Sequence, residues 1–330
     1  MIHAPSISVV LCTYNGQKFL QEQIDSIAAQ TLLPGELIVC DDLSTDSTVD
    51  LLNAFAANVT FPVHVYRNDQ QVGSTRNFDH ALSLAHGDLL VLCDQDDLWE
   101  PQKLERLYEV MRDESIGGIF TDATLIDEKN RVMEDRLWAR AGFTSERQTA
   151  FQRDPVGVLL RQSVATGATM MIRARLRTTY EHIPNSWVHD GWLAWMLVLY
   201  QNNVGRLQPL QEPLTRYRVH TSQQTGSAAL ALGLPTESVA QRMAKARRAG
   251  HTHHMKNAAQ LQLVLDHWLE HGGSPQASVA HRLNGAIRLL EQRSMLPNRR
   301  LRRLIAVLKL LPAYLRYASG WRSAARDFFA

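Results

Sequence analysis

The residues that point most directly to chemistry lie at positions 88–100, where an apolar run ends in a cluster of acids. Residues 89–93 have the unbroken apolar pattern of a strand that is buried on both faces of a sheet. The acids that follow are Asp94, Asp96 and Asp97. Carboxylates this close repel one another unless a cation neutralises them, so the cluster predicts a divalent metal site. The alternative is a polar turn that caps the next helix, with Pro101 in its first turn.

Polar residues also follow the first two predicted strands, residues 6–12 and 36–40. They are Thr13, Tyr14 and Asn15 after the first strand, and Asp41 and Asp42 after the second. In open α/β sheets ligands bind beyond the carboxyl ends of the strands, so we expect these residues and the acidic cluster to share one crevice. The acids after the second strand suit donors of a nucleoside, and a cation at the cluster suits a diphosphate, because Mg²⁺ and Mn²⁺ bridge phosphates readily.

Several other kinds of site are excluded by the sequence. No GxxxxGK[ST] sequence is present, so there is no P-loop, and no GxGxxG follows the first strand. A phosphatase nucleophile of the D-x-D-x-T type would need threonine where Leu98 stands. The cysteines close apolar runs and show no metal-binding spacing, so we expect buried, reduced thiols at Cys12, Cys40 and Cys93.

The elements that must position these residues alternate between strands and helices. Strands are expected at residues 6–12, 36–40, 63–66, 89–93, 117–121, 168–172, 204–207 and 214–219, and helices at 17–30, 44–58, 74–85, 102–111 and 191–200. The β-α-β-α-β-α-β order at the start of the chain predicts an α/β fold with a mostly parallel sheet. Residues 122–152 are charged and weakly patterned, and we expect an insertion near the mouth of the crevice.

The character of the chain changes after residue 222. Residues 221–226 and 233–235 have the composition of a linker, so we expect a catalytic domain at 1–222 and a basic, amphipathic helical region at 223–330. One interpretation of these helices is a solvated face on a packing domain. We favour peripheral attachment to anionic lipid, because each basic residue near such a surface contributes ~1 kcal/mol. Nucleic acid is not an expected partner, since no motif accompanies the charge.

Bulk composition is that of a globular protein. The 330 residues are 45% hydrophobic and 21% charged, with a net charge of +2. No apolar run approaches the ~20 residues of a spanning helix. The first residues show no basic n-region and no signal-peptide core, so we expect a cytoplasmic protein, peripheral at the inner face of the plasma membrane. The oligomeric state, a homo-oligomer included, stays open.

Six motifs in this order resemble glycosyltransferase family 2, whose fold is GT-A. They are V-V-L-C-T-Y-N-G, I-V-C-D-D-L-S-T-D-S-T, N-D-Q-Q-V-G-S-T-R-N-F, C-D-Q-D-D-L-W-E-P-Q-K-L, H-D-G-W and Y-R-V-H. Within the family, they look most like bacterial rhamnosyltransferase-type enzymes of surface-polysaccharide assembly. The resemblance spans residues 5–222. It implies a Rossmann-like, mixed, mostly parallel sheet flanked by helices, with the C-terminal helices as an extension.

The resemblance also implies roles for individual residues. Those implied to bind the nucleotide sugar are Thr13, Tyr14, Asn15, Asp41, Gly73, Arg76, Asp94 and Gln95. Among them, Asp41 would accept a hydrogen bond from the base and Arg76 would lie near the diphosphate. Asp94 would contact the ribose or the donor sugar.

Three further residues would complete the chemistry. Asp96 and His220 would hold Mg²⁺ or Mn²⁺, and Asp190 would be the general base. The alternative for Asp190 is the N-cap of the apolar helix that follows it, and a histidine such as His220, taken alone, is more often an ordinary surface residue. Acceptor contacts are expected from Trp99, Trp187 and His189, with core packing as the alternative for at least one tryptophan among Trp99, Trp187 and Trp192. The chain departs from the common family pattern at Leu43, where glycine is frequent, and at Gly191, where an aromatic residue often follows the base.

The implied activity is an inverting, metal-dependent transfer of a sugar from a nucleotide diphosphate donor to a glycan or a lipid-linked glycan. dTDP-rhamnose is the first donor expected, and UDP-hexoses are the second. A sugar-phosphate nucleotidylyltransferase would need a G-x-G-T-R loop after the first strand, where T-Y-N-G stands. A non-catalytic module that binds nucleotide sugars or glycans is the remaining alternative.

Overall fold

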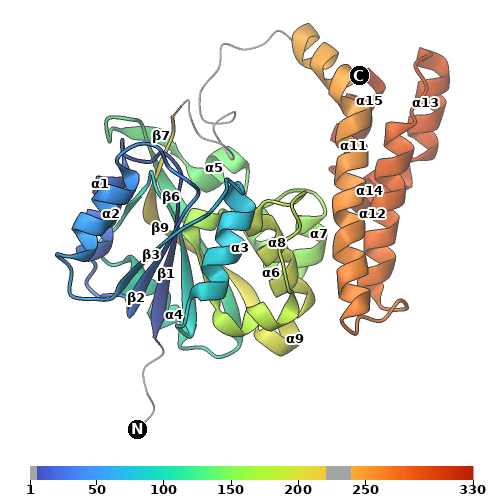
Figure 1. Cartoon of the computed structure of the whole chain (residues 1–330). Coiled ribbons are helices and arrows are strands. Elements are labelled where there is room, and N and C mark those ends of the chain that lie inside the picture. Colours follow the sequence, from blue (N-terminus) through green and yellow to red (C-terminus); the bar gives the residue numbers. More distant parts are fainter. Residues whose placement is uncertain (1–5, 221–238, 330) are drawn as a thin grey trace. The chain divides into compact units, whose positions relative to one another are not determined.

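The computed structural model describes residues 6–220 and 239–329, with side chains from residue 252 onward in the second range. The chain divides into two compact units (Figure 1). The first contains residues 1–148 and 164–232, and the second contains residues 149–163 and 233–330. Residues 149–163, which the sequence analysis placed in the first domain, thus group with the C-terminal helices. The expected linker at 221–226 and 233–235 lies outside the described residues.

The strands of the described chain form one nine-stranded sheet in the first unit, in the order β3-β2-β1-β4-β8-β6-β9-β5, with β7 beside β6. They are β1 (Ile7–Thr13), β2 (Glu36–Asp41), β3 (Val63–Arg67), β4 (Leu89–Asp94), β5 (Leu98–Trp99), β6 (Ile116–Ile126), β7 (Val132–Arg136), β8 (Met170–Arg173) and β9 (Arg206–Arg218). Strands β3, β2, β1 and β4 are parallel to one another, and β8 is antiparallel to both β4 and β6. The expected mixed α/β architecture is confirmed.

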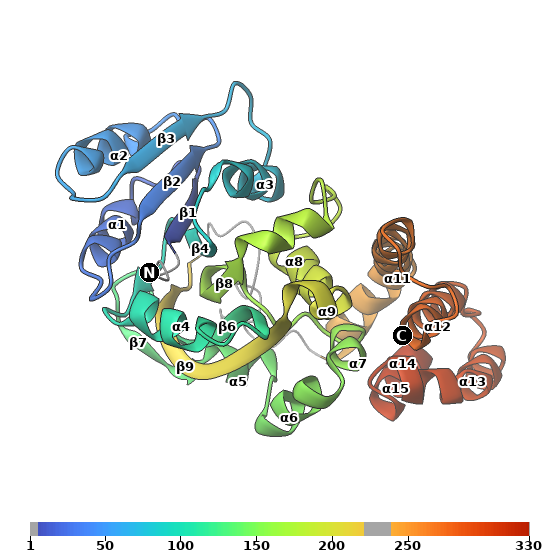
Figure 2. The same ribbon diagram turned by 90° about the horizontal axis from the view of Figure 1, so that it is seen from below.

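Helices cover both faces of this sheet (Figure 2). One face carries α1 (Leu20–Ala28) and α2 (Thr48–Ala56), and the other carries α3 (Ser74–Leu84) and α8 (His189–Leu199). Right-handed crossovers put α1 and α2 on the same face, because β1, β2 and β3 advance in one direction across the sheet. The chain then returns to β4 on the other side of β1, so α3 takes the opposite face. This reversal beside β1 is the point at which open α/β sheets bind ligands.

The helices are held by apolar faces at helical spacing. Helix α1 buries Leu20, Ile24 and Ile27 against the sheet, and these residues recur every three or four positions as a core-facing stripe requires. Among the described residues, the other α-helices of this unit are α4 (Lys103–Met111), α5 (Leu137–Ala141) and α9 (Gln201–Val204), while α6 (Ser145–Arg153) crosses the boundary between the units. All three cysteines are free and buried, as expected.

Two expectations about the second half of the sheet are wrong. Residues 122–152 are not a separate insertion, since β6 runs on to Ile126 and is followed by β7, α5 and α6. Polar residues hid this strand: Thr121 and Asp122 are buried, and the Asp122 carboxylate accepts hydrogen bonds from the backbone N–H groups of Ala123 and Trp138. The two short strands expected at 204–207 and 214–219 are one long strand, β9, which contains Pro209 and Pro213.

The second unit is helical, as expected. It contains α7 (Pro155–Leu159), α11 (Val239–Glu270), α12 (Ser278–Ser294), α13 (Arg300–Lys309), α14 (Leu311–Tyr317) and α15 (Trp321–Phe329). Its small core includes the phenol of Tyr314, which donates to Asp327 at 2.6 Å, and Arg293, whose guanidinium forms two hydrogen bonds with the same carboxylate. Across residues 6–220 and 239–329, none of the helices combines the length and apolarity needed to cross a bilayer.

Candidate active site

A cavity of about 390 Å³ lies beyond the carboxyl ends of β1, β2 and β4. Residues from all the expected strand ends line it: Thr13, Tyr14, Asn15, Asp42, Asp94, Gln95 and Asp96. His220, two residues after the end of β9, lines it as well. The expectation of a single crevice at these strand ends is therefore confirmed.

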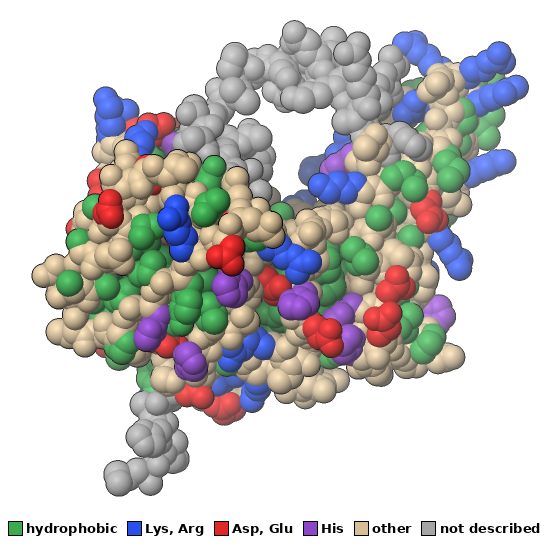
Figure 3. Space-filling model, viewed as in Figure 1, with side chains coloured by type: hydrophobic (Ala, Val, Ile, Leu, Met, Phe, Trp, Pro, Cys, Tyr) green, Lys and Arg blue, Asp and Glu red, His purple; other side chains and the backbone are tan. Residues whose placement is uncertain are grey.

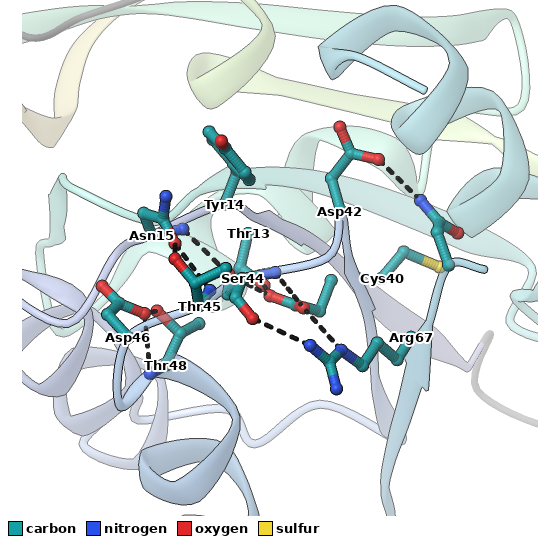
Figure 4. A network of polar contacts seen from close by, with 12 residues as sticks. Thr13, Tyr14, Asn15, Cys40, Asp42, Ser44, Thr45, Asp46, Thr48 and Arg67 are labelled. Carbon is teal, nitrogen blue, oxygen red and sulfur yellow. Dashed lines mark hydrogen bonds and ion pairs between the residues drawn. The ribbon is translucent and has the colours of Figure 1, made fainter. Parts of the chain in front are cut away.

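The ends of β1 and β2 are joined by buried hydrogen bonds (Figure 4). The hydroxyl of Thr13 donates to Asp41 at 2.8 Å, and the backbone N–H of Ser44 donates to the other carboxylate oxygen at 2.8 Å. Asp41 is fully buried and does not reach the cavity. The Asp41 carboxylate is thus engaged by the turn, and its contact with the base stays a prediction.

The neighbouring residue, Asp42, lines the cavity instead. Its carboxylate accepts hydrogen bonds at 2.8 Å from the backbone N–H groups of Val72 and Gly73. Gly73 has a φ of 82°, a conformation that favours glycine, and immediately precedes α3. Asp42 therefore fixes the loop before α3 at the edge of the cavity.

The turn after β2 contains a residue in a strained conformation. Leu43, the departure noted in the sequence, has a φ of 68°. This left-handed region costs a residue with a Cβ roughly 1–2 kcal/mol relative to glycine. A glycine at this position would adopt this φ without that strain.

The carboxylates after β4 crowd together, as the sequence predicted. Burial, followed by the negative charges of Asp96 and Asp190, raises the pKa of Asp94 to about 7. His220 Nε2 lies 2.7 Å from Asp96 Oδ2, so the imidazole and this carboxylate are in hydrogen-bond contact at one point of the cavity wall. Asp97 is fully buried and turned away from the cavity, where one of its oxygens accepts the backbone N–H of Arg218 at 2.9 Å.

Gln95 holds the β4 end against the β1 end. Its side-chain oxygen accepts the backbone N–H of Tyr14 at 2.8 Å, and its side-chain nitrogen donates to the Tyr14 carbonyl at 3.1 Å. A Cβ at Gly16 would lie only 2.3 Å from the same Gln95 oxygen. The close approach therefore depends on glycine at position 16.

Asp190 lies in the first turn of α8, and its negative charge helps to raise the pKa of Asp94, although Asp190 is not among the residues that line the cavity. Its carboxylate accepts the backbone N–H of Gly167 at 3.1 Å and that of Gly191 at 2.6 Å. The helix begins one residue earlier, with Val188 as its N-cap residue. Asp190 is thus not the N-cap residue that the alternative interpretation required.

The aromatic candidates for acceptor contacts occupy different environments. Trp99 is buried in the main core, and Trp192 is also buried. The expectation that Trp99 stacks on an acceptor is therefore corrected, because the pairing of β5 with β9 turns the Trp99 ring inward. His189 is buried too, stacked on Phe78 with ring centroids 3.9 Å apart. Trp187 is half-buried, and its ring lies 3.2 Å from the position of a Cβ at Gly191. An aromatic side chain is therefore present beside Gly191, although it comes from position 187.

Arg76 is not among the residues that line the cavity. Its guanidinium contacts the side chain of Asn185 and lies 3.6 Å from Asp79. The structure thus pairs Arg76 with its own helix and the 182–187 loop, and its contact with a diphosphate stays a prediction.

Two buried cations support the site, and both belong to the motifs although no role was expected for either. The guanidinium of Arg218, in Y-R-V-H, is fully buried and donates to the Asp96 carbonyl at 2.7 Å and to Glu22 at 2.8 Å. Lys103, in the motif after β4, donates to the Ala168 carbonyl at 2.8 Å and to the Thr215 hydroxyl at 2.9 Å. The signal that could have found them is a charged residue inside an otherwise buried motif.

The residues present fit a divalent cation. Asp96 and His220 offer an oxygen and a nitrogen ligand at one point of the cavity. The raised pKa of Asp94 shows that a positive charge would relieve repulsion there. Within the described ranges, no group of three or more His, Cys, Asp or Glu side chains is arranged to hold a metal by itself.

Solved structures with a similar fold include two proteins in complex with nucleotide sugars. TarS of S. aureus, in a crystal structure of residues 1–349 in complex with UDP-GlcNAc, has a similar fold, with a TM-score of 0.58, 14% identity, and coverage of 98% of this chain and 89% of that one. The mannosyltransferase PcManGT of Pyrobaculum calidifontis, in complex with GDP-Man and Mn²⁺, has a TM-score of 0.56 and 16% identity over 95% of this chain and 79% of its own.

Among sequences, the putative teichuronic acid biosynthesis glycosyltransferase TuaG of Bacillus subtilis is 26% identical over 215 residues, which are 65% of this chain and 79% of that protein. These likenesses identify the fold as GT-A, as expected from the motifs. Residues 8–174, just over half of the chain, match the family described as Glycosyl transferase family 2. The protein is therefore a glycosyltransferase and belongs to glycosyl transferase family 2.

Proposed function

We propose that this enzyme is an inverting, metal-dependent glycosyltransferase of bacterial surface-polysaccharide synthesis. It moves a sugar from a nucleotide diphosphate donor to a hydroxyl group of a glycan or a lipid-linked glycan. The observation that chiefly supports this is the meeting of Asp94, Asp96 and His220 with the polar residues after β1 in one cavity. TuaG, named for teichuronic acid biosynthesis, supports the pathway class, and TarS and PcManGT, which bind UDP-GlcNAc and GDP-Man, support the donor class.

The donor proposed first is dTDP-rhamnose, and a UDP-hexose is second. Asp96 and His220 would hold Mg²⁺ or Mn²⁺, and the Mn²⁺ bound by PcManGT supports this choice. When bound, the cation supplies positive charge for the departing diphosphate. The enzyme would work at the inner face of the plasma membrane, where a lipid-linked acceptor is available.

The reaction is a single in-line displacement at the anomeric carbon. The carboxylate of Asp190, oriented by the N–H groups of Gly167 and Gly191, accepts the proton of the acceptor hydroxyl. A positioned base of this kind contributes about 10²–10⁴ in rate. A phosphate leaving group needs no general acid, so a single carboxylate is sufficient on the acceptor side.

The proposal is tested by nucleotide binding and turnover measured together. We expect dTDP or UDP to raise the melting temperature only when Mn²⁺ is present, because a ligand that binds the folded state stabilises it. Asp190→Asn is expected to keep this shift and to lose turnover by about 10²–10⁴. Asp50→Asn, at an exposed position on α2, is the matched control and keeps both.

Two results would contradict the proposal. A melting temperature that no nucleotide changes in the presence of metal would show that the cavity does not bind the proposed donor. Unchanged turnover of Asp190→Asn would show that another group accepts the proton.

A further inference from the structure

The second unit presents apolar side chains to solvent along one helix. On α13, Leu301 is 72% exposed, Leu308 is 51% exposed and Ile305 is 47% exposed. These residues recur every three or four positions, so they form one stripe. Val307, the buried residue of the helix, points to a different side, toward the core of the unit. Leu315 and Trp321, at the neighbouring α14 and α15, are also more than half exposed. Large apolar side chains gathered in this way mark an interaction surface.

The same helices carry a strong positive charge. The exposed basic residues are Arg299, Arg300, Arg302, Lys309, Arg316, Arg322 and Arg326. The sole acid among residues 295–329 is Asp327, and it is buried against Arg293. In Figure 3, Lys and Arg side chains gather around α13 beside hydrophobic ones. We name the exposed residues of α13 with Leu315 and Trp321 the basic-apolar surface.

We propose that the basic-apolar surface docks on a lipid bilayer that contains anionic lipid. An apolar stripe flanked by cations on a helix too short to span a membrane has the chemistry of an interfacial helix. The stripe would enter the boundary of the acyl chains while the arginines and Lys309 meet headgroup phosphates. The proposal rests on the proposed function in one respect, since a lipid-linked acceptor would make this location useful.

The chemistry of the surface favours a bilayer over two other occupants. A second copy of the chain that used the same surface in a two-fold dimer would bring like charges together, because no exposed acid lies among residues 295–329. A nucleic acid would engage the cations, but it offers no apolar phase for Leu301, Ile305 and Leu308. An anionic bilayer offers acyl chains to the apolar stripe and phosphate groups to the basic residues.

Flotation of the full chain with vesicles tests this proposal. We expect binding to phosphatidylcholine vesicles with about 30% phosphatidylglycerol, little binding to pure phosphatidylcholine, and release at high salt. Removing two cations by Arg302→Gln with Lys309→Gln is expected to weaken binding about 30-fold, or roughly fivefold for each charge. Arg112→Gln with Arg136→Gln, two exposed arginines of the first unit, is the matched control and should bind like the unchanged protein.

A second variant separates the apolar contribution. Leu301→Ser, Ile305→Ser and Leu308→Ser together should weaken binding to the anionic vesicles at low salt and leave the melting temperature unchanged, since these side chains are exposed. Equal binding to neutral and anionic vesicles, or an undiminished affinity of the Arg302–Lys309 variant, overturns the proposal. So does a surface variant that changes the molar mass of the protein in solution without changing vesicle binding, because the surface would then join copies of the chain. Vesicle binding needs no donor and the nucleotide test needs no membrane, so failure of one proposal is distinguishable from failure of the other.

Discussion

Arg218→Met should damage the fold and the donor site together, because one buried guanidinium joins the acidic turn to two other segments. Its Nε donates to the Asp96 carbonyl at 2.7 Å, and its two Nη atoms donate to Asn130 at 2.5 Å and Glu22 at 2.8 Å. Methionine fills a similar volume but leaves these acceptors without the donor.

The magnitude follows from the burial of each partner. A hydrogen bond to a charged group contributes about 1.5–3 kcal/mol, whereas the ion pair with Glu22 counts for little, since that carboxylate is about half exposed. We expect a loss of about 4 kcal/mol in the free energy of unfolding, the range for removing one partner of a buried charged group. For a unit of this size that corresponds to a melting temperature lower by about 10 °C.

The assay is urea unfolding of the full chain, with nucleotide binding measured on the folded variant at low temperature. Binding should weaken in the presence of Mn²⁺, because the turn that carries Asp96 loses its anchor. Arg216→Met is the matched control: it lies on the same strand, and its ion pair with Glu100 is half exposed, so it should cost less than 1 kcal/mol. A loss for Arg218→Met no larger than that of Arg216→Met, together with unchanged nucleotide affinity, would refute the reasoning.

Three further outcomes are expected. Leu43→Gly should raise the free energy of unfolding by about 1 kcal/mol, measured by its urea midpoint, because the φ of 68° no longer strains a side chain; a lower midpoint would contradict this. Gly16→Ala should cost about 1–3 kcal/mol and weaken nucleotide binding, because the added methyl group displaces the Gln95 amide, and unchanged binding would count against that contact. Burial, and then the charge of Arg293, lowers the pKa of His254 to about 4. The folded state thus binds fewer protons than the unfolded state, and stability should fall as the pH drops from about 6.5 toward 4. His254→Leu should flatten this dependence in urea titrations, and an identical slope in both proteins would show that other groups govern it.

The parallel part of the fold could be predicted closely from the sequence. Strands β1, β2 and β4 consist mainly of apolar residues and β3 alternates Val63 and Val65 with polar residues, and the limits of all four agree with the structure to within a residue or two. The end of β6 and the whole of β9 could not be predicted in this way. Buried polar residues such as Asp122 and the prolines of β9 interrupt the pattern that sequence analysis depends on.

The site shows the same division. That acids after β2 and β4 meet in one crevice follows from the order of strands and helices, because neighbouring parallel strands end at one edge. Which of Asp41 and Asp42 faces the cavity does not follow, since it depends on the left-handed turn at Leu43 and on the hydrogen bonds of Ser44. The burial of Trp99 depends in turn on the pairing of β5 with β9, a contact between residues far apart in the sequence.

The grouping of residues 149–163 with the C-terminal helices has a consequence for how the chain folds during its synthesis. Within the second unit, the Arg282 guanidinium donates two hydrogen bonds of 2.7 Å to the Asp154 carboxylate, and Arg161 donates to the Ala318 carbonyl at 3.0 Å. Residues 149–163 leave the ribosome long before residues 282 and 318 are synthesised. These short helices therefore cannot form their contacts within the second unit until the end of the chain has been made. A chain cut after residue 220 would leave them permanently without those partners, and we expect such a truncation to aggregate although it keeps every strand of the sheet.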